Sequence, residues 1–171
     1  MEKMVSKPAE LYWRGTEQAW SAALLGPIGA LATAGSGARD ADYMLRMLER
    51  EKIDIAEIVY SEATRQIAVS GRFEAADSDK TDAVLNFSVD LYGFNKTHPF
   101  GSNMNPLIQI TGKLSKPDLT IVWHQSEMVS DLASDNDQGQ PMSVYQGEPA
   151  KLRAALTKAS EVAVRRLLSK L

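Results

Sequence analysis

The sequence contains no cysteine and only two histidines among its 171 residues. The lack of cysteine excludes disulfides, thiolate nucleophiles, thiolate zinc sites and iron–sulfur clusters within these residues. No GxSxG elbow, phosphate-loop lysine motif or HExxH motif occurs. His98 falls in an expected loop and His124 on an expected wet strand face, and neither has catalytic partners at suitable spacing. We therefore expect no enzyme, no metal site and no cofactor.

An excess of positive charge is also missing. Lys plus Arg number 19 against 22 Asp plus Glu, which gives a net charge of −3. Nucleic-acid binding requires clustered Lys and Arg, so nucleic acid is not the expected partner. Hydrophobic residues make up 44% and charged residues 24%, as in ordinary globular proteins, and the length suits one domain.

Charge is absent altogether from Gln18 to Ala38, a run of 21 residues rich in Ala and Gly. As a helix it would span about 30 Å, the thickness of a bilayer core, but Pro27 and several glycines weaken a helix. Three interpretations stay open: a segment packed on the protein, a membrane contact, or a processing remnant. Its large apolar residues are the expected partner or membrane contacts: Trp20, Leu24, Leu25, Ile28 and Leu31. Residues 1–38 are therefore treated as an N-terminal segment and 39–171 as a single α/β domain.

Three amphipathic helices follow from apolar spacing. Asp40 or Asp42 can cap the first, and Asp54 with Glu57 has the capping-box spacing of a second helix that ends at Gly71. The last is expected over residues 148–171, with an apolar stripe formed by Leu152, Leu156, Ala159, Ala163, Leu167 and Leu171.

The clearest strand covers residues 83–92, in which apolar and polar residues alternate. This alternation predicts one buried face and one polar face, followed by a loop over residues 95–106. Strands over 108–114 and 119–123 form an expected hairpin in which Leu114 faces Leu119, and Gly112 leaves room for the indole of Trp123. Short edge strands are expected at 72–74 and 11–13. Candidate ligand-binding residues on the polar face are Asn86, Asp90, Tyr92, Gln109 and His124.

The two last segments carry opposite charge. Residues 127–147 form a long polar connection with a charge of −4, and the final helix carries +4. The basic residues could balance the acidic loop, but exposed ion pairs are weak, so a solvated charged face is the favoured interpretation. The order of elements predicts an α/β (α+β) two-layer sandwich, with a mixed or mainly antiparallel sheet of about four strands and helices on one face.

Four segments resemble small Gram-negative envelope lipoproteins with a domain similar to the TolB N-terminal domain and the curli-secretion lipoproteins. They are DIAEIVYSEATRQIAVSGRFE, TDAVLNFSVDLYGF, PLIQITGKLSKPDLTIVWHQS and LRAALTKASEVAVRRLLSKL, within residues 54–171. The resemblance implies a periplasmic accessory or assembly protein, often oligomeric, anchored to the outer membrane and without catalytic residues. Such an anchor needs a lipid-bearing cysteine, which this chain does not contain.

The leading hypothesis is therefore a non-enzymatic cell-envelope domain acting through contacts with envelope proteins or with itself. Residues 18–38 are its candidate membrane contact. The alternative hypothesis is a small-molecule or peptide-binding domain that uses the polar sheet face.

Overall fold

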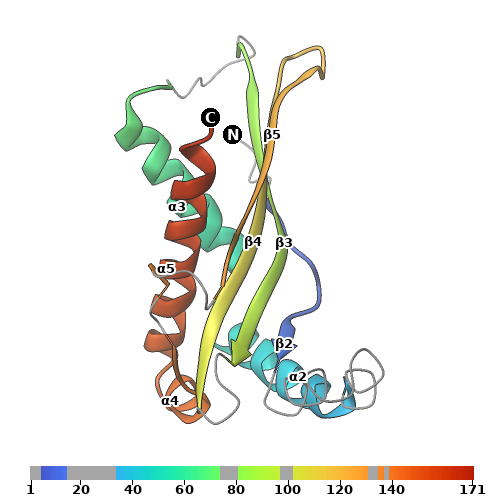
Figure 1. Cartoon of the computed structure of the whole chain (residues 1–171), viewed down its shortest axis with the longest axis vertical. Helices are drawn as coiled ribbons and strands as arrows, with labels where there is room; N and C mark the ends of the chain where they lie inside the picture. The colour runs from blue at the N-terminus through green and yellow to red at the C-terminus, as the bar shows by residue number, and fades with distance from the viewer. Residues whose placement is uncertain (1–4, 15–33, 74–80, 97–101, 131–134, 137–138) are drawn as a thin grey trace.

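The computed structural model describes residues 5–14, 34–73, 81–96, 102–130, 135–136 and 139–171. In this part of the chain the helices α3 and α5 lie on one side of a long sheet, and α2 lies across one end (Figure 1). The elements are β1 (Val5–Ser6), β2 (Tyr12–Arg14), α2 (Ala34–Arg50), α3 (Ile55–Ser70), β3 (Val84–Lys96), β4 (Asn103–Ser115), β5 (Ile121–Val129), β6 (Gln140–Pro141), α4 (Met142–Gly147) and α5 (Pro149–Leu168).

The expected two-layer α+β class is confirmed, with four helices and a mixed sheet among the described residues. The expected strand number is corrected, because the sheet has six strands rather than about four. Its order is β1-β3-β4-β5, with β2 also paired to β3 and β6 to β4. The pairs β3–β4 and β4–β5 are antiparallel, whereas β1 and β2 run parallel to β3. The edge strand expected at 11–13 is present as β2, one residue further along the chain. The strands β1 and β6, which were not expected, have only two residues each, too few to give an alternating pattern.

Strand β3 changes face part-way along its length. The pairing shifts between Val89 and Leu91, which leaves Asp90 as an extra residue in a β-bulge. Beyond the bulge Tyr92 and Phe94 point into the core, at 3% and 0% exposure. The expectation that Tyr92 lies on the polar face is therefore wrong. The expected loop at 95–106 is also shorter, because β3 continues to Lys96 and β4 begins at Asn103.

The hairpin between β4 and β5 has a different register from the expected one. Leu114 pairs with Trp123 rather than facing Leu119, and Gly112 pairs with Gln125. Leu119 belongs to the turn, where its φ is 68° and its side chain is 83% exposed. The amide of Thr120 donates to the Asp118 carboxylate at 2.9 Å, which stabilises a wider turn than the sequence indicated.

A bulge also occurs at the start of β5. Trp123 pairs with Leu114 and Ile121 pairs with Ser115, so Val122 is the extra residue. The regular part of β5 therefore runs from Trp123 to Val129.

Helix α3 matches its sequence signals. The side chain of Asp54 accepts a hydrogen bond from the amide of Ala56 at 2.8 Å, as a capping residue does. Gly71 ends the helix in the left-handed conformation, with φ 61°. Residues 71–73 form no strand, contrary to the expectation for this segment.

Helix α2 begins at Ala34, before the expected capping residues Asp40 and Asp42, which lie within the helix. The end of the uncharged run is thus helical. The expected contacts of this run lie outside the described residues: Trp20, Leu24, Leu25, Ile28 and Leu31. No helix within the described ranges combines the length and the apolar character needed to cross a membrane.

The core fills the space between the sheet and the helices. The stripe of α5 is buried as expected from Leu152 at 0% exposure to Leu167 at 0%, and each large apolar side chain there contributes about 1.5–3 kcal/mol by burial. The helix ends at Leu168, so the last expected member, Leu171, lies beyond it and is only partly buried. Gly112 has the predicted role, because a Cβ at this position would lie 2.6 Å from the ring of Trp123 and 3.0 Å from Leu167. The sheet is thus held closely against α5.

Candidate functional site

Strand β5 forms one end of the strand order, and its outer edge has no paired strand among the described residues. The hairpin that it forms with β4 extends past the C-terminal end of α5 (Figure 1). Three large apolar side chains of β5 are exposed, Ile121 at 53%, Val122 at 48% and Met128 at 50%. An open strand edge with exposed apolar side chains is the arrangement that accepts another strand.

The two faces of the regular part of β5 differ. Trp123, Gln125, Glu127 and Val129 pair with even-numbered residues of β4, whose side chains face α5, whereas His124, Ser126 and Met128 lie on the opposite face. Trp123 is anchored on the helix side, where its indole N–H donates to the carbonyl of Lys170 at 2.9 Å.

Charged groups at the C-terminal end of α5 and just after it hold the inner side of β5. Lys170 forms an ion pair with the Glu127 carboxylate, and Arg166 lies 4.0 Å from it. Arg165 and Arg166 both bind Asp135, at 2.7 Å and 2.6 Å. Two acidic residues, Glu127 and Asp135, therefore pair with the basic end of the chain, while the basic side chains stay 34–50% exposed, so this charged face is both paired and solvated.

The segment after β5 is fixed by a buried amide. Asn136 is 2% exposed, and its Nδ2 donates to the carbonyls of Pro106 at 2.8 Å and Ser130 at 3.0 Å. Together with the charges on α5, this amide makes the inner side of β5 rigid. The outer edge of β5 has no paired strand in the part of the chain that the structure describes.

Four of the five candidate ligand-binding residues lie on or beside the sheet face opposite the helices: Asn86, Asp90, Gln109 and His124. Tyr92 lies in the core instead, and burial raises the pKa of its phenol. Asp90 accepts hydrogen bonds from Ser88 at 2.8 Å and from Thr111. Each of the two carboxylate oxygens of Asp90 therefore accepts a hydrogen bond from a neighbouring side chain of the sheet.

Gln109 lies beside this bulge, opposite Leu91, and His124 lies further along the sheet. Gln109 donates to Ser126 at 3.3 Å, and His124 pairs with Lys113 in the sheet register. The sequence found this face but not the bulge that divides it.

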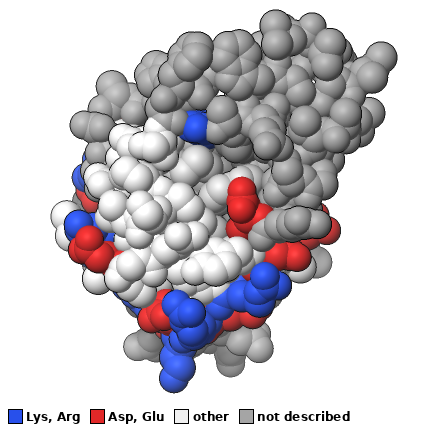
Figure 2. Space-filling model, turned by 90° about the horizontal axis from the view of Figure 1, so that it is seen from below, with Lys and Arg blue, Asp and Glu red and all other residues white. Residues whose placement is uncertain are grey.

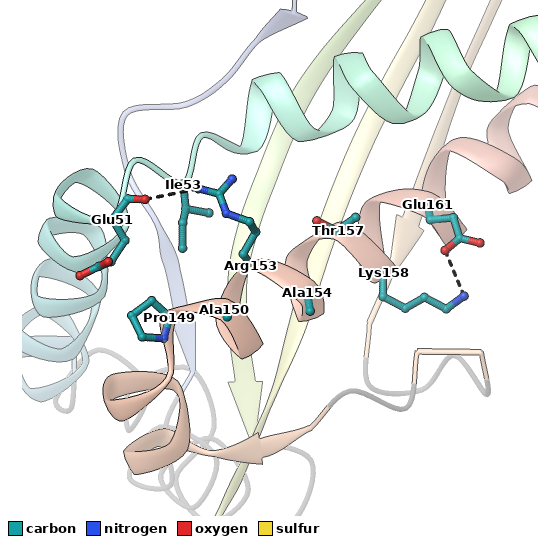
Figure 3. Close-up of a pocket in the computed structure, with 9 residues that line it drawn as sticks. All are labelled: Glu51, Ile53, Pro149, Ala150, Arg153, Ala154, Thr157, Lys158 and Glu161. Atoms are coloured by element: carbon teal, nitrogen blue, oxygen red, sulfur yellow. Dashed lines mark hydrogen bonds and ion pairs between the residues drawn. The ribbon is translucent and has the colours of Figure 1, made fainter.

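A shallow depression of about 610 Å³ lies beside the first half of α5 (Figure 3). Its apolar wall includes Ile53 and Pro149. Arg153 donates to the carbonyls of Lys52 at 2.9 Å and Glu51 at 3.3 Å, and Lys158 pairs with Glu161 at 3.1 Å. Arg153 thus holds α5 to the end of α2, as a cationic group at a helix C-terminus does, whereas the Lys158–Glu161 pair lies within α5.

The end of the molecule that carries α4 has a largely uncharged described surface, with acidic and basic residues beside one another at its border (Figure 2). The run from Gly139 to Gly147 contributes no charge to this end. The phenol of Tyr145 lies beneath it and donates to the carbonyl of Met104 at 3.3 Å. Burial raises the pKa of Tyr145 to about 12, so its hydroxyl is neutral and acts as a structural donor.

Within the described ranges, no group of three or more His, Cys, Asp or Glu residues is placed to hold a metal ion. The carboxyl pKa of Asp54 is lowered although burial acts to raise it, because Lys7 and the amide of Ala56 bind the charged form. This ion pair measures 3.0 Å and ties β1 to the start of α3.

No protein-family model matches the chain. No curated protein sequence matches it either. Among solved structures, the chain is similar to a Xanthomonas campestris protein described as a member of the DUF330 family. The TM-score is 0.47 and the sequence identity 18%, and the match covers 66% of this chain and 58% of that chain. The chain thus spans less than two thirds of this protein from a Gram-negative bacterium.

Proposed function

We propose that this chain is a non-enzymatic accessory or assembly domain of the bacterial cell envelope that acts through protein–protein contacts. The observation that carries the proposal is the open edge of β5, with exposed apolar side chains at Ile121, Val122 and Met128. Main-chain groups on such an edge provide affinity for an extended segment, and alternate side chains provide selectivity.

The envelope setting is supported by the sequence resemblance over residues 54–171. The segments that carry it fall in α3, β3, the β4–β5 hairpin and α5, which include the three long strands of the sheet. The finer proposal is a periplasmic protein anchored to the outer membrane by a lipid. Because the 171 residues contain no cysteine, the lipidated residue would lie outside them.

Location is tested with the protein in its native cell. Membrane and soluble fractions are probed with an antibody, and cells are fed an alkyne-labelled fatty acid that marks lipidated proteins. We expect the protein in the outer-membrane fraction with the lipid label. A protein found only in the cytosol would contradict the envelope setting, and an unlabelled periplasmic protein would contradict the lipid anchor alone.

Contact through β5 is tested by photo-crosslinking in the same cells. A photoreactive residue replaces Met128 on β5, and a control replaces Thr64, which is exposed on α3. We expect a discrete covalent product from position 128 and none from position 64. Equal labelling from the two positions would rule out β5 as the contact surface.

The alternative function, binding of a small molecule or peptide, has one supporting observation. Gln109, Lys113, His124 and Ser126 lie together on the sheet face opposite the helices. Addition of a mixed tripeptide library should then shift the NMR signals of these residues, and His124→Ala should reduce the shifts. Unchanged spectra at millimolar peptide would exclude this alternative.

A further inference from the structure

The partner of the open edge can be specified from the strand itself. We infer that β5 pairs with β5 of a second copy of this chain, antiparallel, about a two-fold axis that passes beside Ser126. This inference rests on the proposed function in one respect, since it names the partner of the same edge.

The first argument is geometric. A two-fold axis perpendicular to the sheet keeps each side chain on its own face, so one residue of β5 must lie opposite its own copy. The regular part of β5 runs from Trp123 to Val129, and Ser126 is its midpoint. An axis at Ser126 therefore pairs all of this segment. An axis at Gln125 or Glu127 pairs two residues fewer in each chain. To pair as many, it would have to include the bulge at Val122 or residues beyond Val129.

The second argument is the chemistry of the resulting pairs on the helix side. Gln125 lies opposite Glu127 of the second copy, and the same pair forms again across the axis. An amide N–H₂ donates to a carboxylate, so both pairs are favourable. The outer pair is apolar, because Trp123 faces Val129 of the second copy.

The opposite face is equally compatible. The two Ser126 hydroxyls lie across from each other. Each donates to the Ile110 carbonyl of its own chain at 3.3 Å, and rotation of either hydroxyl lets it donate to the other oxygen instead. Met128, which is 50% exposed in one chain, lies opposite His124 of the second copy and is covered. No like charges face each other at this register, whereas an axis at Glu127 would place two carboxylates in contact.

The edge also lacks the features that prevent pairing. From Trp123 to Val129 there is no proline and no lysine, and the single acidic residue, Glu127, faces α5, where Lys170 binds it. Natural sheets usually block exposed edges with such residues. The segment is thus suited to pairing and complementary to itself.

The first test uses the absence of native cysteine. Ser126→Cys introduces a single thiol, which can form a disulfide only between two chains. Opposite residues in an antiparallel pair have Cα atoms about 4.5–5.5 Å apart, within the range of a disulfide. Under mild oxidation of the full chain we expect most of this variant to become a covalent dimer. The matched control, Val69→Cys on the exposed face of α3, should stay largely monomeric. Equal yields from the two variants would overturn the inference.

The second test fixes the register by charge. In the Gln125→Glu dimer, the new carboxylate of each chain faces Glu127 of the other chain. In the Gln125→Lys dimer, an ammonium group takes that place in each of the two pairs. Each interaction occurs twice, so sedimentation velocity should show the dimer Kd rise by about tenfold for Glu and fall by about tenfold for Lys. An axis at Gln125 would instead make both variants weaker, because each new charge would face itself.

Control variants Val69→Glu and Val69→Lys carry the same net charges away from β5 and should leave the Kd unchanged. Circular dichroism establishes that each variant is folded. If Gln125→Glu is not folded, the inference is tested by the Gln125→Lys variant and by the comparison of Ser126→Cys with Val69→Cys. A wild-type chain that stays monomeric at millimolar concentration overturns the inference.

The two proposals fail in different ways. A monomeric chain whose position 128 still crosslinks to another envelope protein would overturn self-pairing and leave the proposed function standing. A β5-paired dimer found only in the cytosol would overturn the proposed function and leave the pairing standing.

Discussion

The two edges of the sheet are built in opposite ways. The first edge consists of β1 and β2, with two and three residues, separated by a segment that contains Pro8. The second edge carries β5, whose regular part extends from Trp123 to Val129 without proline. Short strands and proline prevent further pairing, so the first edge is closed to partners. The second edge has only a bulge at Val122, at its far end.

The difference also extends to how each edge is attached. The first edge is held by pairing with β3 and by packing, with Tyr12 against Gly93 and the ring centroids of Trp13 and Phe94 6.1 Å apart, and by the one ion pair of Lys7 with Asp54 described above. The second is held from behind by ion pairs of Glu127 and Asp135 with α5. Because β5 pairs with β4 on one side and contacts α5 behind, the main-chain groups on its outer side have no paired strand among the described residues. The chain thus separates the edge that stabilises the fold from the edge that can bind.

The largest effect is expected at the first edge. Gly93 has φ 155°, and a Cβ there would lie 1.9 Å from the carbonyl oxygen of Tyr12. Gly93→Ala should therefore displace β2 and lower the free energy of unfolding by about 3 kcal/mol or more. Urea denaturation measures the loss. The control is Gly147→Ala, where no atom lies within 4 Å of the added Cβ. Similar stability of the two variants would show that β2 is not closely held.

A smaller effect is expected behind the second edge. Gly112→Ala would place a methyl group 2.6 Å from the Trp123 ring and 3.0 Å from Leu167. The ring must shift, which should cost about 1–3 kcal/mol and change the tryptophan fluorescence. Because the outer edge of β5 is untouched, the dimer Kd should change less than it does for Gln125→Glu. A loss below about 0.5 kcal/mol would mean that the indole moves freely.

Gly112 also shows which part of the hairpin could be predicted from the sequence. Its role beside Trp123 was predicted correctly although the pairing register was wrong. A glycine within a strand indicates a close approach at any register, whereas the register depends on the turn. The turn is widened by Asp118 and by the left-handed Leu119, and a side chain as large as leucine gives no signal for that conformation.

The bulge at Asp90 was missed for a related reason. The residues on either side, Val89 and Leu91, continue the alternation, so the pattern alone indicates one straight strand. The extra residue is selected by contacts far along the chain, in particular the hydrogen bond from Thr111 to Asp90. Helix signals were more reliable, because Asp54 and Gly71 act through neighbouring residues. The open edge itself depends on strand order, which no local pattern encodes.

The attachment of the second edge can be weakened without touching it. Asp135→Asn removes the carboxylate that binds Arg165 and Arg166. These groups are partly exposed, so the expected loss is about 0.5–1 kcal/mol, and it should shrink in high salt. The control Glu148→Gln removes a single exposed pair with Lys151 and should have a smaller effect. If the two variants lose the same stability and show the same salt dependence, the ion pairs of Asp135 contribute no more than a single exposed pair.

The smallest expected effect is a pH-dependent contribution to stability from the Lys7–Asp54 pair at the first edge. Lys7 and the amide of Ala56 lower the carboxyl pKa of Asp54, against the effect of burial. The folded protein binds this proton less readily than the unfolded chain, whose value is 3.8. The contribution of the Asp54 carboxylate to the free energy of unfolding is therefore complete above the pKa of the unfolded chain. It is lost as the pH falls through the lower pKa of the folded protein. Asp54→Asn keeps a capping side chain but removes the charge, so it should cost a few tenths of a kcal/mol at about pH 7.

That small cost should disappear in acid, where the wild-type carboxyl is protonated. Urea denaturation from about pH 7 to about pH 2.5 measures the difference between the two proteins. Lys7→Ala should follow the same profile, because it removes the other half of the 3.0 Å pair. The dimer Kd should not depend on either substitution, since the pair ties β1 to α3 and β5 lies at the other edge. A joint change in stability and dimer affinity would mean that the two edges are coupled through the sheet.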